Sequence, residues 1–167
     1  MRWWIRPGII NRRLCLDTNY LVSLFDDTDL WYPRASEIRG LLRQNPVAVS
    51  YFDCVLNELF TVLARRSRER GTPEAFPALM DRVLQAIPET TVTWLYPYLP
   101  LWYGRCLNIM RESQGQLNFH DAVIVVAMQE LGFSALVSFD AGFDEVASIN
   151  RLGSTNEVEI WLRERHP

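Results

Sequence analysis

Acidic side chains stand at four positions from which they could share one site, namely Asp17, Glu58, Asp121 and Asp140. Asp17 follows the apolar run 13–16, and Asp140 follows the apolar run 135–139. We expect both runs to be strands of one open parallel sheet, whose carboxyl ends border the crevice where ligands bind. Either aspartate could instead be a simple helix cap or turn former.

The other two acids are expected on helices. At about 100° per residue, Glu58 falls beside Val55 and Val62, at the edge of an apolar stripe that faces the core. Asp121 begins the most apolar helix of the chain, where a carboxylate can interact with free backbone amides and the positive end of the helix dipole. The alternatives are a solvated glutamate at position 58 and a simple capping aspartate at position 121.

A site shared by these carboxylates implies a metal ion. Crowded acids repel one another and raise some of their pKa values unless a cation neutralises them. Oxygen ligands suit Mg²⁺ or Mn²⁺, while the lack of a histidine and cysteine set argues against zinc. One or two such ions can activate water and stabilise the leaving oxygen during attack on a phosphodiester. No histidine or serine nucleophile is then required.

Short apolar strands alternate with helices, which favours an α/β sandwich around a mostly parallel sheet. The strands are expected at 13–16, 47–50, 91–95 and 135–139, and helices at about 20–25, 31–44, 74–86, 98–113 and 119–131. Another helix is expected after 47–50, with Ser50 as its cap and Phe52 in its apolar stripe. The length of 167 residues fits one domain. We assign residues 12–167 to this domain and residues 1–11 to an N-terminal extension.

Composition is that of an ordinary globular protein, with a formal net charge of −3 and arginine as the source of all 17 basic side chains. A nucleic-acid-binding domain usually carries a basic footprint, so this charge counts against such a function unless cations neutralise the acids. Cys15, Cys54 and Cys106 lack paired spacing and are expected to be buried reduced thiols. The opening segment is too short and too charged for a signal peptide or membrane span. A cytoplasmic protein without membrane contact is therefore expected.

Four segments together resemble the PIN-domain family. They are Leu-Asp-Thr-Asn at 16–19, Glu58 on the helix after Val-Ala-Val-Ser, Asn-Phe-His-Asp-Ala at 118–122 and Ser-Phe-Asp-Ala-Gly-Phe-Asp at 138–144. Their order and spacing are similar to those of VapC-type toxins. The resemblance runs from about residue 13 to about residue 152, and the last two segments with their connecting helix are its most distinctive part.

The resemblance implies a three-layer α/β/α fold and Mg²⁺- or Mn²⁺-dependent endonuclease activity on RNA, usually in a homodimer. A VapC-like toxin would also have a cognate antitoxin as its inhibitor. By position, Asp17 and Asp121 would be metal ligands, Glu58 would complete the acidic set, and Asp140 would be a more variable fourth acid and further ligand. Asn19 and Ser138 match small polar residues that support the acids, and Asp144 matches a structural or peripheral position.

Substrate contacts and rival functions are less sharply indicated. Arg65, Arg66 and Arg68 could bind RNA phosphates, although the pattern favours a solvated helix end over that role. Trp31, Trp94 and Trp102 could stack on unpaired bases or pack in the core or a dimer interface. The main rival function is a non-catalytic PIN-like module that binds RNA or protein, but no acid of the set is missing. A receiver domain or a Rossmann-like phosphohydrolase normally needs a lysine, which this chain lacks.

Overall fold

The computed structural model describes residues 13–164, so the predicted extension at residues 1–11 lies outside the described residues. The strands are β1 Arg13–Leu16, β2 Ala48–Phe52, β3 Val92–Thr93, β4 Ala135–Val137 and β5 Arg151–Leu152. The α-helices are α1 Thr18–Phe25, α2 Tyr32–Gln44, α3 Asp53–Glu69, α4 Phe76–Ala86, α5 Leu99–Glu112, α6 Phe119–Leu131 and α7 Thr155–Arg163. Short 3₁₀ helices are η1 Pro73–Ala75, η2 Glu89–Thr91, η3 Tyr96–Tyr98 and η4 Ala141–Glu145.

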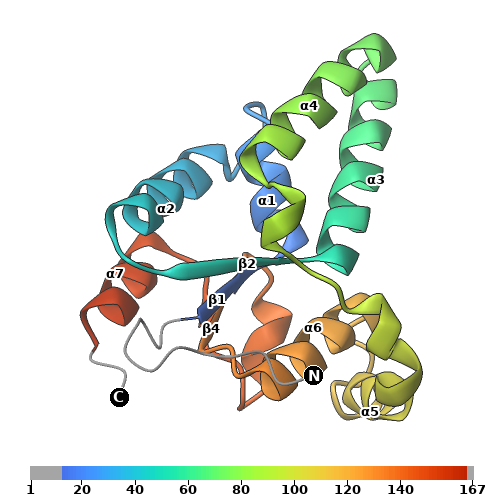
Figure 1. Cartoon of the computed structure of the whole chain (residues 1–167), viewed down its shortest axis with the longest axis vertical. Helices are drawn as coiled ribbons and strands as arrows, with labels where there is room; N and C mark the ends of the chain where they lie inside the picture. Colours follow the sequence, from blue (N-terminus) through green and yellow to red (C-terminus); the bar gives the residue numbers. More distant parts are fainter. Residues whose placement is uncertain (1–12, 165–167) are drawn as a thin grey trace.

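The five strands form one parallel sheet in the order β3-β2-β1-β4-β5. Helices cover both of its faces, with α1 and α6 on opposite sides in Figure 1, so the predicted three-layer α/β/α fold is confirmed. The chain moves from β1 to β2 and β3 in one direction and then places β4 on the other side of β1. This change of direction opens a crevice at the carboxyl ends of β1 and β4, where ligands bind in open parallel sheets.

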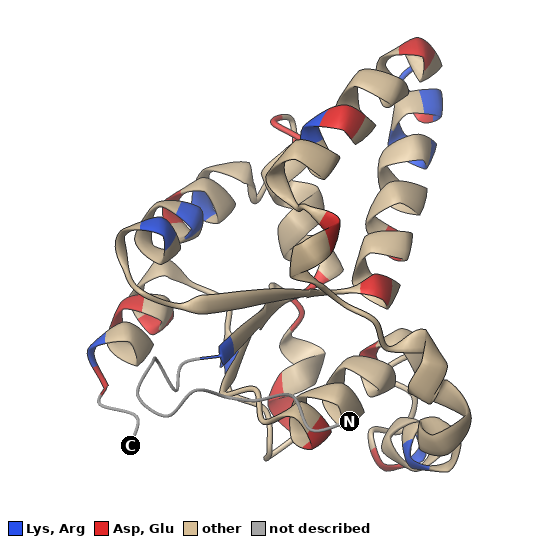
Figure 2. Ribbon diagram, in the orientation of Figure 1, with Lys and Arg blue, Asp and Glu red and all other residues tan. Residues whose placement is uncertain are grey.

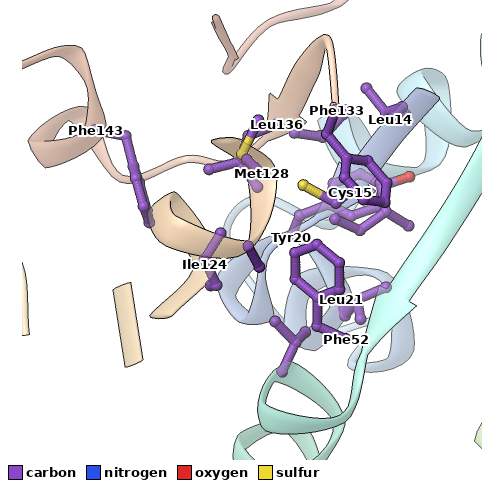
Figure 3. Packing of buried hydrophobic residues seen from close by; sticks show 14 of the residues in the cluster. Leu14, Cys15, Tyr20, Leu21, Phe52, Ile124, Met128, Phe133, Leu136 and Phe143 are labelled. Carbon is purple, nitrogen blue, oxygen red and sulfur yellow. The ribbon is translucent and has the colours of Figure 1, made fainter. Parts of the chain in front are cut away.

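The core lies on both faces of β1, the central strand of the sheet. Leu14, Cys15 and Leu16 are almost fully buried, and Figure 3 shows the first two among side chains of α1 and α6. Residues 122–128 of α6 are all buried, which explains why this helix is apolar on every side. The helix ends at Gly132, whose φ of 68° places it in the left-handed region that glycine adopts without strain. The glycine at position 132 thus determines where α6 ends.

Two details of the predicted elements were wrong. Ser50 does not cap α3 but lies within β2, where it pairs with Cys15 of β1. Phe52 is the last residue of β2 rather than part of the helix, because β2 pairs with β3 through Tyr51 and Phe52. The sequence analysis also missed β5 and α7, whose apolar signals are short. None of the described helices is long and apolar enough to cross a membrane.

Candidate active site

Asp17 joins the central strand to the first helix of the fold. It follows β1 directly and is the N-cap of α1, with its Oδ1 accepting a 2.7 Å hydrogen bond from the backbone N–H of Thr18. Its Oδ2 accepts a 2.6 Å hydrogen bond from the Ser138 hydroxyl, which follows β4. The carboxylate is therefore fixed by both strands that border the crevice. Capping and a place in the site are not alternatives here, because Asp17 does both.

Ser138 and Asn19 hold the two sides of the crevice together. Asn19 Nδ2 donates to the Ser138 hydroxyl at 3.1 Å, and Asn19 Oδ1 accepts from the backbone N–H of Phe139 at 2.9 Å. The Ser138 hydroxyl also accepts from the backbone N–H of Asp140 at 3.0 Å. These contacts fit the supporting positions that the sequence analysis proposed for Asn19 and Ser138.

Asp140 lies slightly farther along the chain than the predicted strand end. β4 stops at Val137, and Asp140 instead caps the 3₁₀ helix η4 by accepting a 2.8 Å hydrogen bond from the backbone N–H of Gly142. Gly142 leaves room for this turn, since a Cβ there would lie 3.1 Å from Asp140 Oδ1. One carboxylate oxygen of Asp140 is thus engaged by the turn.

Glu58 reaches the crevice from α3 at the edge of the helix's apolar stripe, as its spacing predicted. Its Oε2 accepts a 2.9 Å hydrogen bond from the hydroxyl of Thr18, the first residue of α1. Val62 and Arg66, one and two turns farther along α3, line the same pocket. This contact fixes α3 against the start of α1 and places Glu58 beside Asp17.

Asp121 is fixed by a reciprocal capping arrangement at the start of α6. Asn118 Oδ1 accepts from the backbone N–H groups of His120 and Asp121, while Asp121 Oδ2 accepts a 2.8 Å hydrogen bond from the backbone N–H of Asn118. Asn118 was not singled out from the sequence. Its signal was available, because a capping residue followed three positions later by an acidic side chain is the spacing of a capping box.

All four predicted acids line one pocket, together with Thr18, Asn19, Trp31 and Asn118. Burial raises the pKa of Asp17 to about 7, against the lowering effect of bonds from Ser138 and Thr18, and the charges of Asp121 and Glu58 raise it further. Burial also raises the pKa of Asp121 to about 6, with the charges of Asp140 and Glu58 adding to the effect. The acids are therefore close enough to affect one another's ionisation.

The donors suit a divalent cation that keeps several of its waters. Within residues 13–164, no three histidine, cysteine, aspartate or glutamate side chains lie close enough to form a complete ligand group for one ion. An ion here would bind one or two of the carboxylates directly and retain water at its other positions, which is the usual way that proteins hold Mg²⁺. Burial and neighbouring charges disfavour the ionised forms of Asp17 and Asp121 in the absence of a cation.

The three arginines proposed for RNA binding lie in different surroundings. Arg66 lines the pocket, but its guanidinium makes 2.7 Å ion pairs with both Asp26 and Asp29. Arg65 is exposed on the same helix and lies 3.8 Å from Glu69, and Arg68 is exposed. Figure 2 shows these basic positions on the upper part of α3, away from the sheet. Arg66 is held by carboxylates, whereas Arg65 and Arg68 are exposed at the end of the helix.

Asp144 and Asp53 lie outside the pocket. Asp144 makes a bidentate ion pair with Arg151, with both distances 2.7 Å, and this ties η4 to β5. Asp53 is buried at the start of α3, where its Oδ2 accepts from the backbone N–H groups of Leu95 and Tyr96. The sequence analysis missed Asp53. Its position next to an apolar run resembles that of Asp17, so only the contacts separate the two roles.

Comparison with known proteins places this chain in a family. A family model described as the PIN domain matches residues 14–149, and the protein therefore belongs to the PIN-domain family. The resemblance found in the sequence is thereby confirmed. Comparison with curated proteins gives no match.

Solved structures with the same fold include toxins. VapC20 of Mycobacterium tuberculosis, a sarcin-ricin-loop-cleaving toxin, is 22% identical with a TM-score of 0.61, covering 80% of this chain and 95% of its own. VapBC2 of Rickettsia felis, solved on a promoter DNA fragment, is 15% identical with a TM-score of 0.62, covering 84% and 97%. PAE2754 of Pyrobaculum aerophilum is 18% identical with a TM-score of 0.56, covering 94% and 91%. Likeness at these identities establishes the fold.

Proposed function

We propose that this protein is a metal-dependent endoribonuclease that hydrolyses phosphodiester bonds of RNA. The observation that carries the proposal is that Asp17, Glu58, Asp121 and Asp140, from four separate parts of the chain, line one pocket at the switch point of a parallel sheet. PIN-domain membership and the fold shared with an RNA-cleaving toxin support the same reaction.

Mg²⁺ or Mn²⁺ is the cofactor that these oxygen donors favour. Asp17 and Asp121 would hold the ion directly, and Asp140, the further ligand expected from the sequence, would bind it through one of the retained waters. The bound ion would supply Lewis acidity and lower the pKa of a coordinated water. Ser138 and Thr18 fix the Asp17 carboxylate from two directions. Asn118 fixes Asp121 in the same way. The chain thus orients its carboxylates before any substrate arrives.

Glu58 is the acid best suited to accept a proton from the attacking water. Among the described residues, its Oε2 alone is engaged, by a neutral hydroxyl, and Glu58 borders the pocket from a different helix than the proposed ligands. A carboxylate in this position can take a proton without giving up a ligand position. Exchange of the Thr18 hydroxyl for a methyl group would leave Glu58 free to rotate away.

The test is cleavage of a mixed RNA pool by purified protein with EDTA, Mg²⁺ or Mn²⁺, alongside Asp121→Asn. We expect cleavage only with metal and a loss of roughly 10³-fold or more in the variant, since a ligand charge is removed. Asp144→Asn is the matched control, because Asp144 is bound by Arg151 outside the pocket. Full activity of Asp121→Asn would refute the proposal.

The alternative function is a non-catalytic PIN-like module that binds RNA or a protein. It would be favoured by RNA binding that is unchanged when EDTA is added and when Asp121 is replaced. The presence of all four acids in one pocket favours catalysis, because their mutual repulsion costs stability that a binding module has no reason to retain.

We propose further that the protein is the toxin of a type II toxin–antitoxin pair and works as a homodimer in the reducing cytoplasm. The shared fold with a VapBC assembly supports an antitoxin partner, and three buried free cysteines support a reducing compartment.

Exposed apolar side chains between residues 94 and 103 supply a surface that a second copy could cover. Light scattering of the purified chain tests the dimer, and growth arrest on expression without a partner tests the toxicity.

A further inference from the structure

Trp31 presents an aromatic ring at the edge of the acidic pocket. Its side chain is 39% exposed, and it lines the same pocket as the four carboxylates. Phe139, between Ser138 and Asp140, stacks on its ring with centroids 5.3 Å apart and planes 23° from parallel. The backbone N–H of Trp31 also donates to Asp29 Oδ1 at 2.9 Å. Phe139 thus holds the ring in place, and the Trp31 side chain remains partly exposed to solvent.

Arg34 lies one helical turn away, with its guanidinium carbon 4.6 Å from the centroid of the Trp31 ring. Among residues 13–164 it has no carboxylate within ion-pair distance, and its one polar contact is a long 3.4 Å hydrogen bond to the Gly153 carbonyl. Arg66, the other arginine beside the pocket, is bound by two carboxylates. Arg34 is therefore the cation at this edge that is available to a phosphate.

We propose that Trp31 and Arg34 bind the nucleotide next to the bond that is cut, with the base unpaired. The indole ring stacks on the base, and the guanidinium binds a neighbouring phosphate. This inference rests on the proposed nuclease function and adds to it the two side chains that bind an unpaired nucleotide beside the cleavage site. Bases inside a duplex are stacked on one another and do not expose a face to the ring.

Displacement of the Arg34 guanidinium from the Trp31 ring by a nucleobase is favourable. A cation–π contact at an exposed site is weaker than stacking of a nucleobase on an aromatic side chain. Arg34 is a long and exposed side chain whose remaining contacts are weak. When a base takes its place on the ring, the guanidinium gains a phosphate partner. The two contacts therefore strengthen each other on RNA binding.

The test measures binding of a fluorescein-labelled oligoadenylate dodecamer in Mg²⁺, with all proteins carrying Asp121→Asn so that the probe survives. We expect Trp31→Ala to weaken binding by about 5- to 50-fold and Trp31→Phe to retain most of it, because an aromatic ring still stacks. Ile160→Ala is the control, since Ile160 is a 48% exposed apolar side chain on α7 that does not line the acidic pocket. Binding of Trp31→Ala within twofold of the parent protein overturns the proposal.

Salt dependence separates the two contacts. We expect Arg34→Gln to reduce the slope of log affinity against log salt by about 0.7, because one phosphate contact to a single strand is lost. Trp31→Ala should leave that slope unchanged, since stacking releases no counterions. Arg82→Gln, which changes an exposed arginine on α4 that does not line the acidic pocket, is the matched control. An unchanged slope in Arg34→Gln removes Arg34 from the proposal.

A duplex probe tests whether the bound base must be unpaired, and it keeps this inference separate from the nuclease proposal. The dodecamer paired with oligouridylate should bind more weakly than the single strand, and Trp31→Ala should abolish that preference. Equal binding of both probes, or no binding of either, overturns the inference. Metal-dependent cleavage by protein with Asp121 intact is measured independently, so the nuclease function can stand when the Trp31 site fails.

Discussion

Two buried aspartates at opposite ends of α1 have opposite electrostatic surroundings. Asp17 begins the helix, is bound by the neutral groups of Thr18 and Ser138, and has its pKa raised to about 7 by burial. Asp26 ends the helix, and burial alone would raise its pKa too, but hydrogen bonds from Arg70 and Arg66 hold it well below its usual range. Both side chains are at most 5% exposed.

The difference shows where the chain supplies its own cations. At Asp26 the fold brings the guanidinium groups of Arg66 and Arg70 to 2.7 Å from Oδ2. These two ion pairs link the end of α1 to the end of α3. At Asp17 it brings four further acids to the same pocket, Asp29, Glu58, Asp121 and Asp140. Among the described residues that line this pocket, Arg66 is the one basic side chain, and it is already paired. Uncompensated charge costs stability, so it is expected where a ligand or metal ion will complete the site.

The largest expected effect comes from making Asp26 resemble Asp17. Arg66→Met with Arg70→Met should lower the free energy of unfolding by about 2–4 kcal/mol at pH 7, because a buried carboxylate loses both partners. The cost stays below that of a wholly buried pair, since Arg70 is 46% exposed. Urea denaturation measures it, with Arg65→Met plus Arg68→Met as the control on the same helix. A loss no greater than in the control would mean that the ion pairs of Asp26 do not stabilise the fold.

A bound metal ion should compensate the charge of Asp17, as Arg66 and Arg70 compensate the charge of Asp26. At 100 times its dissociation constant, Mg²⁺ should stabilise the protein by about 2.7 kcal/mol, an increase of roughly 5–10 °C in Tm. Asp17→Asn and Asp121→Asn should reduce this gain, while Asp144→Asn should keep it. Thermal unfolding with and without EDTA provides the measurement. An equal gain in all four proteins would place the metal elsewhere.

The metal-free protein should lose stability as the pH rises from about 4 to about 7. The pKa of Asp17 rises from 3.8 to about 7 on folding, so in this interval the folded state holds a proton that the unfolded state has released. Asp121, with a pKa of about 6, acts in the same direction. Asp17→Asn should flatten this slope and be more stable than the parent at pH 7 in EDTA, by about 1–3 kcal/mol. A slope that Asp17→Asn leaves unchanged would contradict the assignment.

The smallest expected effect comes from Ser138, whose uncharged hydroxyl donates a hydrogen bond to Asp17. Ser138→Ala should cost about 1 kcal/mol and raise the pKa of Asp17 further, because a bond that favours the ionised form is lost. The pH at which stability falls should therefore move upward. Ser134→Ala, which removes a 2.8 Å hydrogen bond to the Arg13 carbonyl, is the control and should leave that pH unchanged.

Much of the fold could be predicted because its signals are local. The apolar run before Asp17 and the uniformly apolar segment ended by Gly132 fixed β1 and α6, and the edge position of Glu58 followed from helical spacing. The boundary between β2 and α3 could not be predicted in this way. Phe52 suits a strand and a helix equally in isolation, and its pairing with the distant Thr93 decides between them.

The sequence by itself determined that Asp17 follows a strand and that Asp121 lies at the start of a helix, since capping and periodicity depend on neighbouring residues. Only the tertiary structure decided which carboxylates are compensated. Arg66 reaches Asp26 and Asp29 across about 40 positions, while Asp53 is satisfied by the amides of Leu95 and Tyr96. It likewise placed Trp31 on Phe139 at the pocket. Ion pairs and stacking depend on distance in space, which the spacing of residues along a chain does not encode.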